Sequence, residues 1–377
     1  MRFSADTATW ARALRQVAPI ISPQNTLPAL SGIAIDAART GVVHLAATDL
    51  TSEITTSLPA HVADPGGLVL PAETLVALVG RIPAATVHCA ATGDSPVASL
   101  SYGKSRTTLH GFVSTEMPRL LTPASPAPAP TWTLEAGVLA TLARQTLFAT
   151  SRDASRPILT GVQVTMGAGR MRVVGTDGTR LSHADAPVAA LTDPPAPFVV
   201  ARRAFLEAAR LAGPDSAILT HLGDRLRLET LNGTVTTMIL DGTYPDVQRA
   251  LPDPADAAIA FSVPTDALRA AIERLSVVAL RDRAPTLSLH YVDGHIEMEA
   301  ANDVGQAFEV LDVERTGPGG DESMLLHFDP RLLLEGVRSL PADVIHICLL
   351  APDRPVRLAA ADPSPYFHVV LPLRPAG

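Results

Sequence analysis

The segment that decides the fold is Arg172-Val173-Val174-Gly175-Thr176-Asp177-Gly178-Thr179-Arg180-Leu181, near the middle of a chain of 377 residues. Related segments lie upstream at His44-Leu45-Ala46-Ala47-Thr48-Asp49-Leu50 and downstream at Glu297-Met298-Glu299-Ala300-Ala301-Asn302-Asp303. Asp49 is 128 positions before Asp177, and Asn302 is 125 positions after it. Regular spacing of one domain length predicts three copies of one fold.

Each of the three segments has the pattern of a strand that runs into a turn. An Asp or Asn side chain closes such a turn by bonding to the backbone that follows it. Only the middle copy adds Arg180 and Leu181 beside Gly178, where the missing side chain lets another group approach closely. The flanking copies are equally well explained as repeated strand ends.

Length and composition indicate an ordinary globular protein of two or three domains, with a hydrophobic fraction of 47%. The first 20 residues contain Arg2, Arg12 and Arg15 and no uninterrupted apolar core, which argues against a signal peptide or an anchor. Stretches long enough to span a membrane are missing from the sequence. We therefore expect a cytoplasmic protein with no membrane partner.

The two cysteines predict neither a disulfide framework nor a metal site. Cys89 and Cys348 each lie inside an apolar, strand-like run, and neither has a partner at metal-ligand spacing. We interpret both as small buried hydrophobic residues. His88 and His346 lie in the same two runs, and burial is expected for them as well. The sequence predicts no metal and no cofactor.

Every copy contains two similar halves. A short strand, a polar cap and an amphipathic helix open each copy, and the same pattern returns about 65 residues later. Proline-rich connectors at 121–130 and 251–256 separate the copies, so the predicted domains are 1–122, 131–252 and 259–377. The six predicted helices are 7–18, 72–81, 135–149, 202–212, 266–280 and 329–340.

The predicted helices are more basic than the rest of the chain. They hold eleven Arg and seven acidic residues, a net charge of +4. Because the whole chain has a net charge of -8, the residues outside the helices carry a net charge of -12. Basic helices on an acidic chain indicate two faces with different partners. An ordinary solvated helix face is the alternative interpretation.

Six helices side by side at about 8–10 Å spacing give an arc of only about 50–60 Å, which is too short to close around a duplex. Two chains double this arc, and the bore inside helices of about 10 Å thickness then passes double-stranded DNA. Closure would also pair the free sheet edges of the first and third copies. The pattern therefore predicts half of a ring.

Three possible catalytic or nucleotide motifs are rejected. Gly103-Lys104-Ser105 lies between strands rather than before a helix, and Gly167-Ala168-Gly169 lacks the third glycine of a dinucleotide motif. His183 and Asp185 could form a catalytic pair with Asp177, yet no nucleophile or metal spacing accompanies them. Surface turns explain these residues better, although an enzyme that uses Asp177 and His183 stays an alternative.

Further segments carry a family resemblance through their order and spacing. They are Asn25-Thr26-Leu27-Pro28-Ala29-Leu30, Leu159-Thr160-Gly161, the central segment from Gly175 to Leu181, Asp241-Gly242-Thr243-Tyr244-Pro245-Asp246 and Val369-Val370-Leu371-Pro372-Leu373-Arg374. Over nearly its whole length the chain resembles the bacterial beta sliding clamp, the processivity subunit of DNA polymerase III.

The resemblance implies an α+β fold of three tandem clamp domains and a non-catalytic function. Two chains would form a head-to-tail ring around duplex DNA, without sequence preference and associated with the nucleoid. An ATP-driven clamp loader would place the ring on DNA. Polymerases and other proteins with clamp-binding peptides would then be tethered through a groove, which raises their effective concentration on DNA.

The resemblance also implies residues for each surface. The peptide-binding groove would comprise Leu159, Thr176, Gly178, Thr179, Arg180, Leu181, Pro245, Ala250, Val369, Leu371, Pro372, Leu373 and Arg374. Apolar side chains around Gly178 would form a slot for a short aliphatic or aromatic peptide, with Arg180 and Arg374 on its polar atoms. The DNA face would comprise Gln24, Arg152, Arg156, Arg202, Arg203, Arg281 and Arg283. The dimer contact would set Arg106, Thr107 and Leu109 against Val277 and Val278.

The chain departs from the family at several of these positions. Leu371 replaces a common methionine, Ala250 a larger aliphatic residue and Thr179 a histidine, while residues 375–377 extend past the usual end. Leucine adapts less readily than methionine to different ligands, so an altered ligand preference is expected. Gln24 replaces a basic residue, and Thr107 is less apolar than the usual aromatic. Two alternatives stay open: a specialised, inhibitor-resistant second clamp, and a monomeric protein-binding module.

Overall fold

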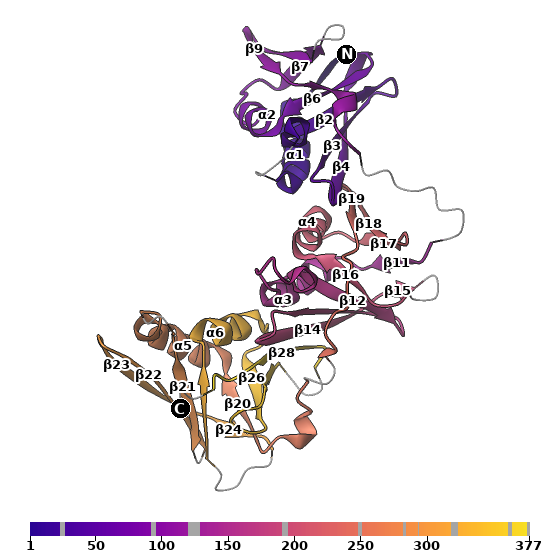
Figure 1. The fold of residues 1–377 in the computed structure, drawn as a ribbon. Helices are drawn as coiled ribbons and strands as arrows, with labels where there is room; N and C mark the ends of the chain where they lie inside the picture. The colour runs from indigo at the N-terminus through magenta and orange to yellow at the C-terminus, as the bar shows by residue number, and fades with distance from the viewer. Residues whose placement is uncertain are drawn as a thin grey trace. The chain divides into compact units, whose positions relative to one another are not determined.

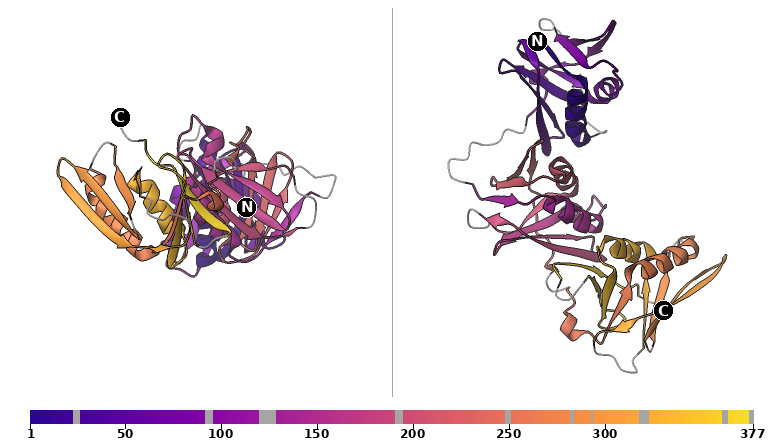
Figure 2. Two further views of the ribbon diagram at one scale, coloured as in Figure 1. Left: turned by 90° about the horizontal axis from the view of Figure 1, so that it is seen from below. Right: turned by 180° about the vertical axis from the view of Figure 1, so that it is seen from behind.

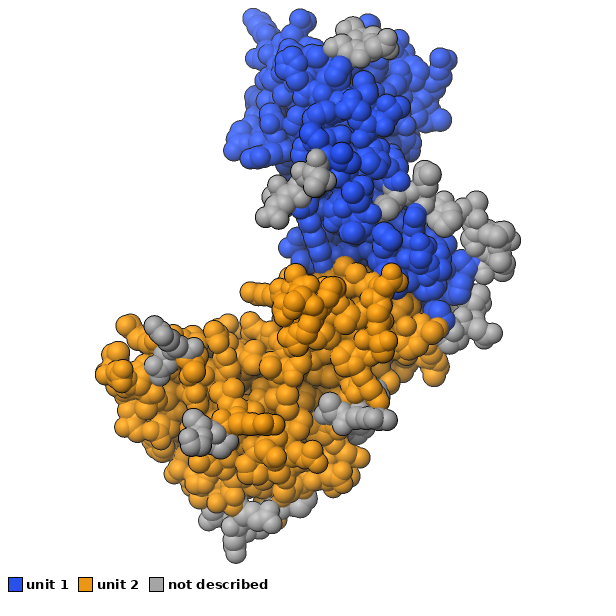
Figure 3. Space-filling model, in the orientation of Figure 1, with its two compact units in different colours: residues 1–140, 188–195, 203–239 blue, residues 141–187, 196–202, 240–377 orange. Residues whose placement is uncertain are grey.

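The computed structural model describes residues 1–22, 27–91, 96–119, 129–190, 195–247, 251–281, 284–292, 294–317, 323–360 and 364–374. By its contacts the chain divides into two compact units (Figure 3). Unit 1 comprises residues 1–140, 188–195 and 203–239, and unit 2 comprises residues 141–187, 196–202 and 240–377.

Six α-helices occur in the described residues, as the sequence predicted (Figure 1). They are α1 (Thr7–Val17), α2 (Ala72–Val79), α3 (Val138–Thr146), α4 (Arg202–Ala212), α5 (Thr265–Ala279) and α6 (Pro330–Ser339). Short 3-10 turns are η1 (Ala18–Ile20), η2 (Pro28–Ser31), η3 (Ser114–Glu116), η4 (Leu147–Ala149), η5 (Pro157–Thr160) and η7 (Pro254–Asp256). The predicted third helix is shorter than expected because its last residues form η4.

Unit 1 contains two antiparallel sheets. The first has the order β5 (His61–Asp64), β1 (Arg2–Asp6), β7 (Thr86–Ala91), β8 (Val97–Tyr102) and β9 (Ser105–His110). The second has the order β10 (Phe112–Val113), β6 (Gly66–Pro71), β2 (Gly32–Ala38), β3 (Val42–Thr48), β4 (Ser52–Pro59), β19 (Gly233–Met238), β18 (Arg225–Thr230), β17 (Ala217–His221), β11 (Thr131–Leu134) and β15 (Ala189–Ala190). Helices α1 and α2 pack on each other and on strands of the second sheet (Figure 2).

Unit 2 also contains two antiparallel sheets. The longer one has the order β16 (Phe198–Ala201), β12 (Gly161–Gly167), β13 (Arg170–Thr176), β14 (Arg180–Pro187), β28 (Tyr366–Val370), β27 (Val356–Ala359), β26 (Val344–Leu349), β20 (Ile259–Pro264) and β24 (Glu314–Arg315). The shorter one has the order β23 (Gly305–Asp312), β22 (His295–Asn302), β21 (Leu287–Val292) and β25 (Met324–Phe328). Helices α5 and α6 pack together, and α5 covers β22 and β23.

Each long sheet joins strands from two of the predicted repeats. In unit 1 the joint is the β4–β19 pair, and in unit 2 it is the β14–β28 pair. Pairing of this kind leaves neither repeat with a free edge at the joint. The two units therefore divide the middle repeat, and the boundaries 1–122, 131–252 and 259–377 stay a prediction.

The turn that follows β3, β13 and β22 has the same side-chain-to-backbone bonds in all three copies. In the first copy the carboxylate of Asp49 accepts hydrogen bonds from the backbone N–H groups of residues 51 and 52. Asp177 accepts from residues 179 and 180, and Asn302 from residues 304 and 305. The side chain at this position fixes the strand-to-strand turn, which explains the repeated Asp or Asn.

The described cysteines are buried, as predicted. Cys89 is fully buried and burial raises the pKa of its thiol to about 12, while Cys348 is 8% exposed. His88 does not follow the prediction, because it is exposed on β7 beside the buried Cys89. Within the described ranges no three His, Cys, Asp or Glu side chains are arranged to hold a metal ion. None of the helices in those ranges has the length and apolarity needed to cross a bilayer.

The prediction that His183 and Asp185 lie in surface turns is wrong. Both residues belong to β14, in the interior of the long sheet of unit 2, and His183 is only 6% exposed. The His183 ring stacks on Phe367 of β28, with 4.5 Å between ring centroids. Asp177 does lie in a turn. The sequence of β14 does not alternate regularly between apolar and polar residues, because both faces of this strand are largely buried.

Candidate functional site

Unit 2 holds a depression of about 170 Å³ beside the turn between β13 and β14. Its walls come from η5, from this turn, from residues 245–247, from Pro355 and from the end of β28. The lining residues are Leu159, Thr176, Gly178, Arg180, Leu181, Pro245, Asp246, Val247, Pro355, Val369 and Leu371. We call this depression the groove.

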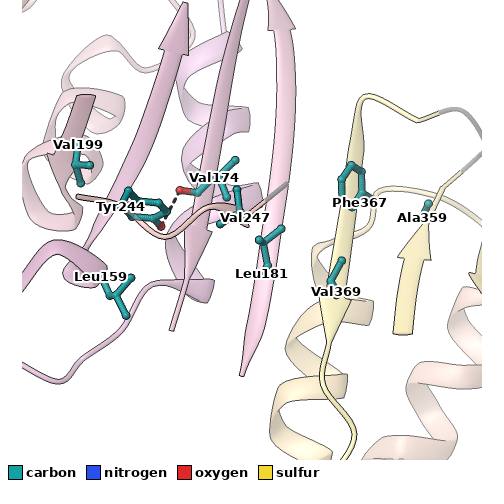
Figure 4. Packing of buried hydrophobic residues seen from close by; sticks show 9 residues of the cluster. All are labelled: Leu159, Val174, Leu181, Val199, Tyr244, Val247, Ala359, Phe367 and Val369. Atoms are coloured by element: carbon teal, nitrogen blue, oxygen red, sulfur yellow. Dashed lines mark hydrogen bonds between the residues drawn. The ribbon is translucent and has the colours of Figure 1, made fainter. Parts of the chain in front are cut away.

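An apolar cluster forms the base of the groove (Figure 4). Leu159, Leu181, Val247 and Val369 belong both to this cluster and to the groove lining. Below them the hydroxyl of Tyr244 donates a hydrogen bond to the carbonyl of residue 174 at 3.2 Å, and burial raises the pKa of this phenol. The groove therefore has a packed apolar floor, which suits aliphatic or aromatic side chains of a ligand.

Backbone bonds connect the turn to the C-terminal strand. Gly178 has a φ of +93°, a conformation that residues with a side chain rarely adopt, and its N–H donates to the Thr176 hydroxyl. Leu371 N–H donates to the carbonyl of Thr179 at 2.9 Å, and Leu373 N–H donates to the carbonyl of His327 at 2.7 Å. The wall formed by Leu371 thus depends on both partners of the β14–β28 joint.

Arg180, which was predicted to hold the polar atoms of a ligand, lines the groove and also has partners within the protein. Its side chain is 10% exposed and bonds within the protein. The Nε atom donates to Asp177 at 3.0 Å, Nη2 donates to the carbonyl of Phe148 at 2.6 Å, and Nη1 pairs with Glu335 on α6. Two carboxylates face this one guanidinium. Arg180 therefore connects the groove turn to η4 and α6, and its contacts support a structural role.

The joint beneath the groove also buries two histidines. Burial lowers the pKa of His368 to about 3 and that of His183 to about 4, the latter opposed in part by Asp185. Neither ring nitrogen of His368 has a hydrogen-bond partner in the described structure. A side chain at position 336 would overlap the His368 ring, so Gly336 makes room for this neutral imidazole.

Acid is expected to destabilise unit 2 through His368. Its pKa is lower in the folded state than the value of about 6.5 in the unfolded chain. Its contribution is therefore complete above pH 6.5 and is lost as the pH falls, because the unfolded state takes up the proton. In urea unfolding at pH 7 and pH 4, His368→Leu should reduce the loss of stability by about 3 kcal/mol. His44→Leu, at an exposed position of β3, should leave the loss unchanged; equal losses in all three proteins would contradict this account.

Eight residues of the predicted groove come together in the lining. Thr179, Pro372, Leu373 and Arg374 are not part of it: the Thr179 hydroxyl bonds to Asp177, and the other three follow Leu371 along the C-terminal segment. Ala250 lies outside the described residues. Asp246, Val247 and Pro355 were missed. Val247 was detectable as an apolar residue two positions after Pro245, but no sequence signal marks Pro355.

The residues predicted to face DNA have different environments. Arg152, Arg156, Arg202 and Arg281 are exposed, although Arg202 also donates to the carbonyl of residue 147. Gln24 and Arg283 lie outside the described residues.

Arg203, also predicted to face DNA, bonds within unit 1 instead. It is half-buried, donates to the carbonyls of Pro19 and Ile21 at 2.7 Å each, and lies 3.7 Å from the Asp49 carboxylate. These contacts give Arg203 a structural role.

The predicted dimer residues lie on or near sheet edges within their own units. Strand β9, with Arg106, Thr107 and Leu109, is an edge strand of the five-stranded sheet. The Thr107 hydroxyl is within 3.0 Å of that of Tyr102, and Leu109 is buried. In unit 2, Val277 on α5 is 68% exposed, and β23 is the edge strand beneath α5.

The repeated fold and the apolar groove define the class of DNA clamp proteins. Models of the DNA polymerase III beta subunit match the chain over its length: the N-terminal domain over residues 1–121, the central domain over 133–246 and the C-terminal domain over 248–374. The chain therefore belongs to the DNA polymerase III beta subunit family.

Curated relatives and solved structures agree with this family. The beta sliding clamp of Synechococcus elongatus is 31% identical, and the match covers 92% of this chain and 92% of the relative. The beta sliding clamp of Caulobacter vibrioides is 27% identical, and the match covers 99% of this chain and 100% of the relative. The beta chain of Streptococcus pneumoniae is 25% identical with a TM-score of 0.90, and covers 99% of each chain. The sliding clamp of Bacillus subtilis has a TM-score of 0.92 at 23% identity over the full length of both chains, which confirms the predicted clamp fold.

Proposed function

We propose that this chain is a sliding clamp that encircles duplex DNA as a homodimeric ring and tethers polymerases and other proteins through its groove. It would act without catalysis, in the cytoplasm and in association with the nucleoid, after loading by an ATP-driven clamp loader. The observation that carries the proposal is the groove. An apolar floor, a glycine turn and the C-terminal strand form one slot within a chain that belongs to the clamp family.

The groove fits a short extended peptide with aliphatic or aromatic side chains. Leu159, Leu181 and Val369 supply an apolar base, and apolar pockets of this kind supply most of the affinity for small segments. Because Arg180 and Asp177 bond to each other, the polar rim would contribute orientation rather than a free cation. Weak binding at such a groove suffices for processivity when the ring keeps the partner near DNA.

The DNA face would contact phosphates without reading sequence. Exposed Arg152 and Arg156 lie between η4 and η5, and Arg156 is 3.5 Å from the Asp153 carboxylate. Phosphate contacts of arginine are electrostatic and fall off with added salt. Retention of the protein on DNA would come from closure of the ring, so these contacts need only guide loading.

Arg152→Ala combined with Arg156→Ala is expected to slow loading onto nicked circular DNA about three- to tenfold, because two phosphate contacts are lost. Gel filtration of loaded complexes after different loading times gives the rate. Arg170→Ala combined with Arg315→Ala removes the same charge from exposed positions outside the predicted DNA face and should load normally. Equal loading rates for both double variants would show that Arg152 and Arg156 are not part of the DNA face. If the wild-type protein is not retained on circular DNA, the proposal of a clamp is contradicted.

Two alternatives are distinguished by simple measurements. A monomeric protein-binding module predicts a solution mass near 39.5 kDa, whereas the ring predicts twice that value. The available edges of β9 and β23 favour the ring, because unpaired strand edges pair readily with another chain. A specialised second clamp would also form a ring but would differ in its partners. A hydrolase is disfavoured, because His183 is buried and stacked on Phe367.

A further inference from the structure

Glu335 on α6 contacts the groove turn without being part of the groove lining. We propose that Glu335 is a positioning residue for peptide binding: it holds Arg180, and through Arg180 it keeps the Asp177–Gly178–Thr179 turn in the shape that forms one wall of the groove. This inference rests on the proposed peptide-binding function.

Three elements fix the Arg180 guanidinium. The Asp177 carboxylate accepts from Nε at 3.0 Å, the carbonyl of Phe148 in η4 accepts from Nη2 at 2.6 Å, and Glu335 pairs with Nη1. The guanidinium also lies 5.5 Å from the centre of the Phe148 ring. Since the Arg180 side chain is 10% exposed, water compensates poorly for the loss of any one of these partners.

The same carboxylate that binds Arg180 also shapes the turn. Asp177 Oδ1 accepts from the backbone N–H groups of Thr179 and Arg180 and from the Thr179 hydroxyl, while Oδ2 accepts from Arg180 Nε. Any movement of the guanidinium therefore pulls on the carboxylate that sets the backbone of the turn. Gly178, which has a φ of +93°, lies at the centre of this segment and lines the groove.

Glu335 is available for Arg180 because both arginines of its own helix have other partners, and Arg338 pairs with Glu273 at 2.8 Å. Arg331, one turn earlier on α6, forms a hydrogen bond of 2.6 Å with Asp329 at the start of the helix. Removal of the Glu335 charge would leave the largely buried guanidinium with Asp177 as its remaining carboxylate in the described contacts. We expect the guanidinium to rotate towards Asp177 and to shift the turn.

The experiment compares Glu335→Gln with a matched control, Glu273→Gln. Glu273 lies on α5, pairs with Arg338 at 2.8 Å and is 42% exposed, against 44% for Glu335, and the groove lining does not include it. Isothermal titration calorimetry with a synthetic clamp-motif peptide should show about three- to tenfold weaker binding by Glu335→Gln and unchanged binding by Glu273→Gln. Thermal unfolding should show that both variants are fully folded at the temperature of the titration, which separates positioning from loss of the fold.

A double-mutant cycle then tests whether Glu335 acts through Arg180. In an Arg180→Ala background, Glu335→Gln should cause no further loss of peptide affinity. Two results would overturn the positioning role, provided that the wild-type protein binds the peptide. One is equal peptide affinity of the Glu335→Gln and Glu273→Gln variants. The other is a full additional loss of peptide affinity when Glu335→Gln is added to Arg180→Ala. Absence of peptide binding by the wild-type protein would instead contradict the proposed function.

Discussion

Removal of residues 371–377 is expected to weaken the binding of a clamp-motif peptide by about 100-fold or more, because it removes one wall of the groove. Leu371 lines the groove while 37% exposed, so its apolar surface is available to a ligand. Its N–H also bonds to the Thr179 carbonyl and so supports the turn opposite. Burial of one such side chain by a ligand contributes about 2–3 kcal/mol, or about 30- to 150-fold in affinity, and the lost support of the turn adds to this loss.

Two measurements separate this effect from unfolding. Calorimetry with the peptide reports the affinity, and sedimentation reports whether the truncated chain keeps the mass of a dimer. A shorter deletion of residues 375–377 keeps every lining residue and both backbone bonds of the C-terminal segment, and should bind the peptide normally. Unchanged affinity after the longer deletion would show that the groove is not the peptide site.

The groove could be predicted only where it follows continuous motifs. The segments around Gly178 and Leu371 supplied six lining residues through the family resemblance, and the shorter segments at Leu159 and Pro245 supplied one each. Pro355 was missed because it precedes β27, far from both motifs, and reaches the groove only through sheet pairing. The ion pair of Arg180 was missed for a similar reason, since its partner Glu335 is 155 positions away and no local pattern connects them.

The repeats were easier to predict than their assembly into sheets. Spacing and amphipathic periodicity identified three copies and six helices, because both signals are local. Pairing of β4 with β19 and of β14 with β28 joins segments that are distant in the chain. Hydrophobic alternation does not specify which edges meet. For this reason the sequence placed His183 in a surface turn, although pairing with β28 sets it against Phe367 in the interior of the sheet.

The glycines of the segment 172–181 also show that packing between distant parts of the chain cannot be predicted from local sequence. The sequence pointed to Gly178 as a place where another group can approach, and within the chain a Cβ there would meet only the flexible Arg156 side chain, at 3.5 Å. The close approach is at Gly175 on β13, where a Cβ would lie against the backbone carbonyl of Thr146 at the end of α3. The contact depends on how α3 packs on the sheet, so it is visible only in the folded structure.

Gly175→Ala is therefore expected to destabilise unit 2 by about 3 kcal/mol or more, because a methyl group cannot fit beside the Thr146 carbonyl without moving α3 or β13. Gly167→Ala is the matched control: this residue ends β12, and a Cβ there would have no neighbour within 4 Å. Its effect should stay within about 0.5 kcal/mol. Urea unfolding of both variants, followed by circular dichroism, gives the two free energies. Equal free energies of unfolding would mean that β13 or α3 moves to accept the methyl group at little cost. The packing of α3 would then not require a glycine at position 175.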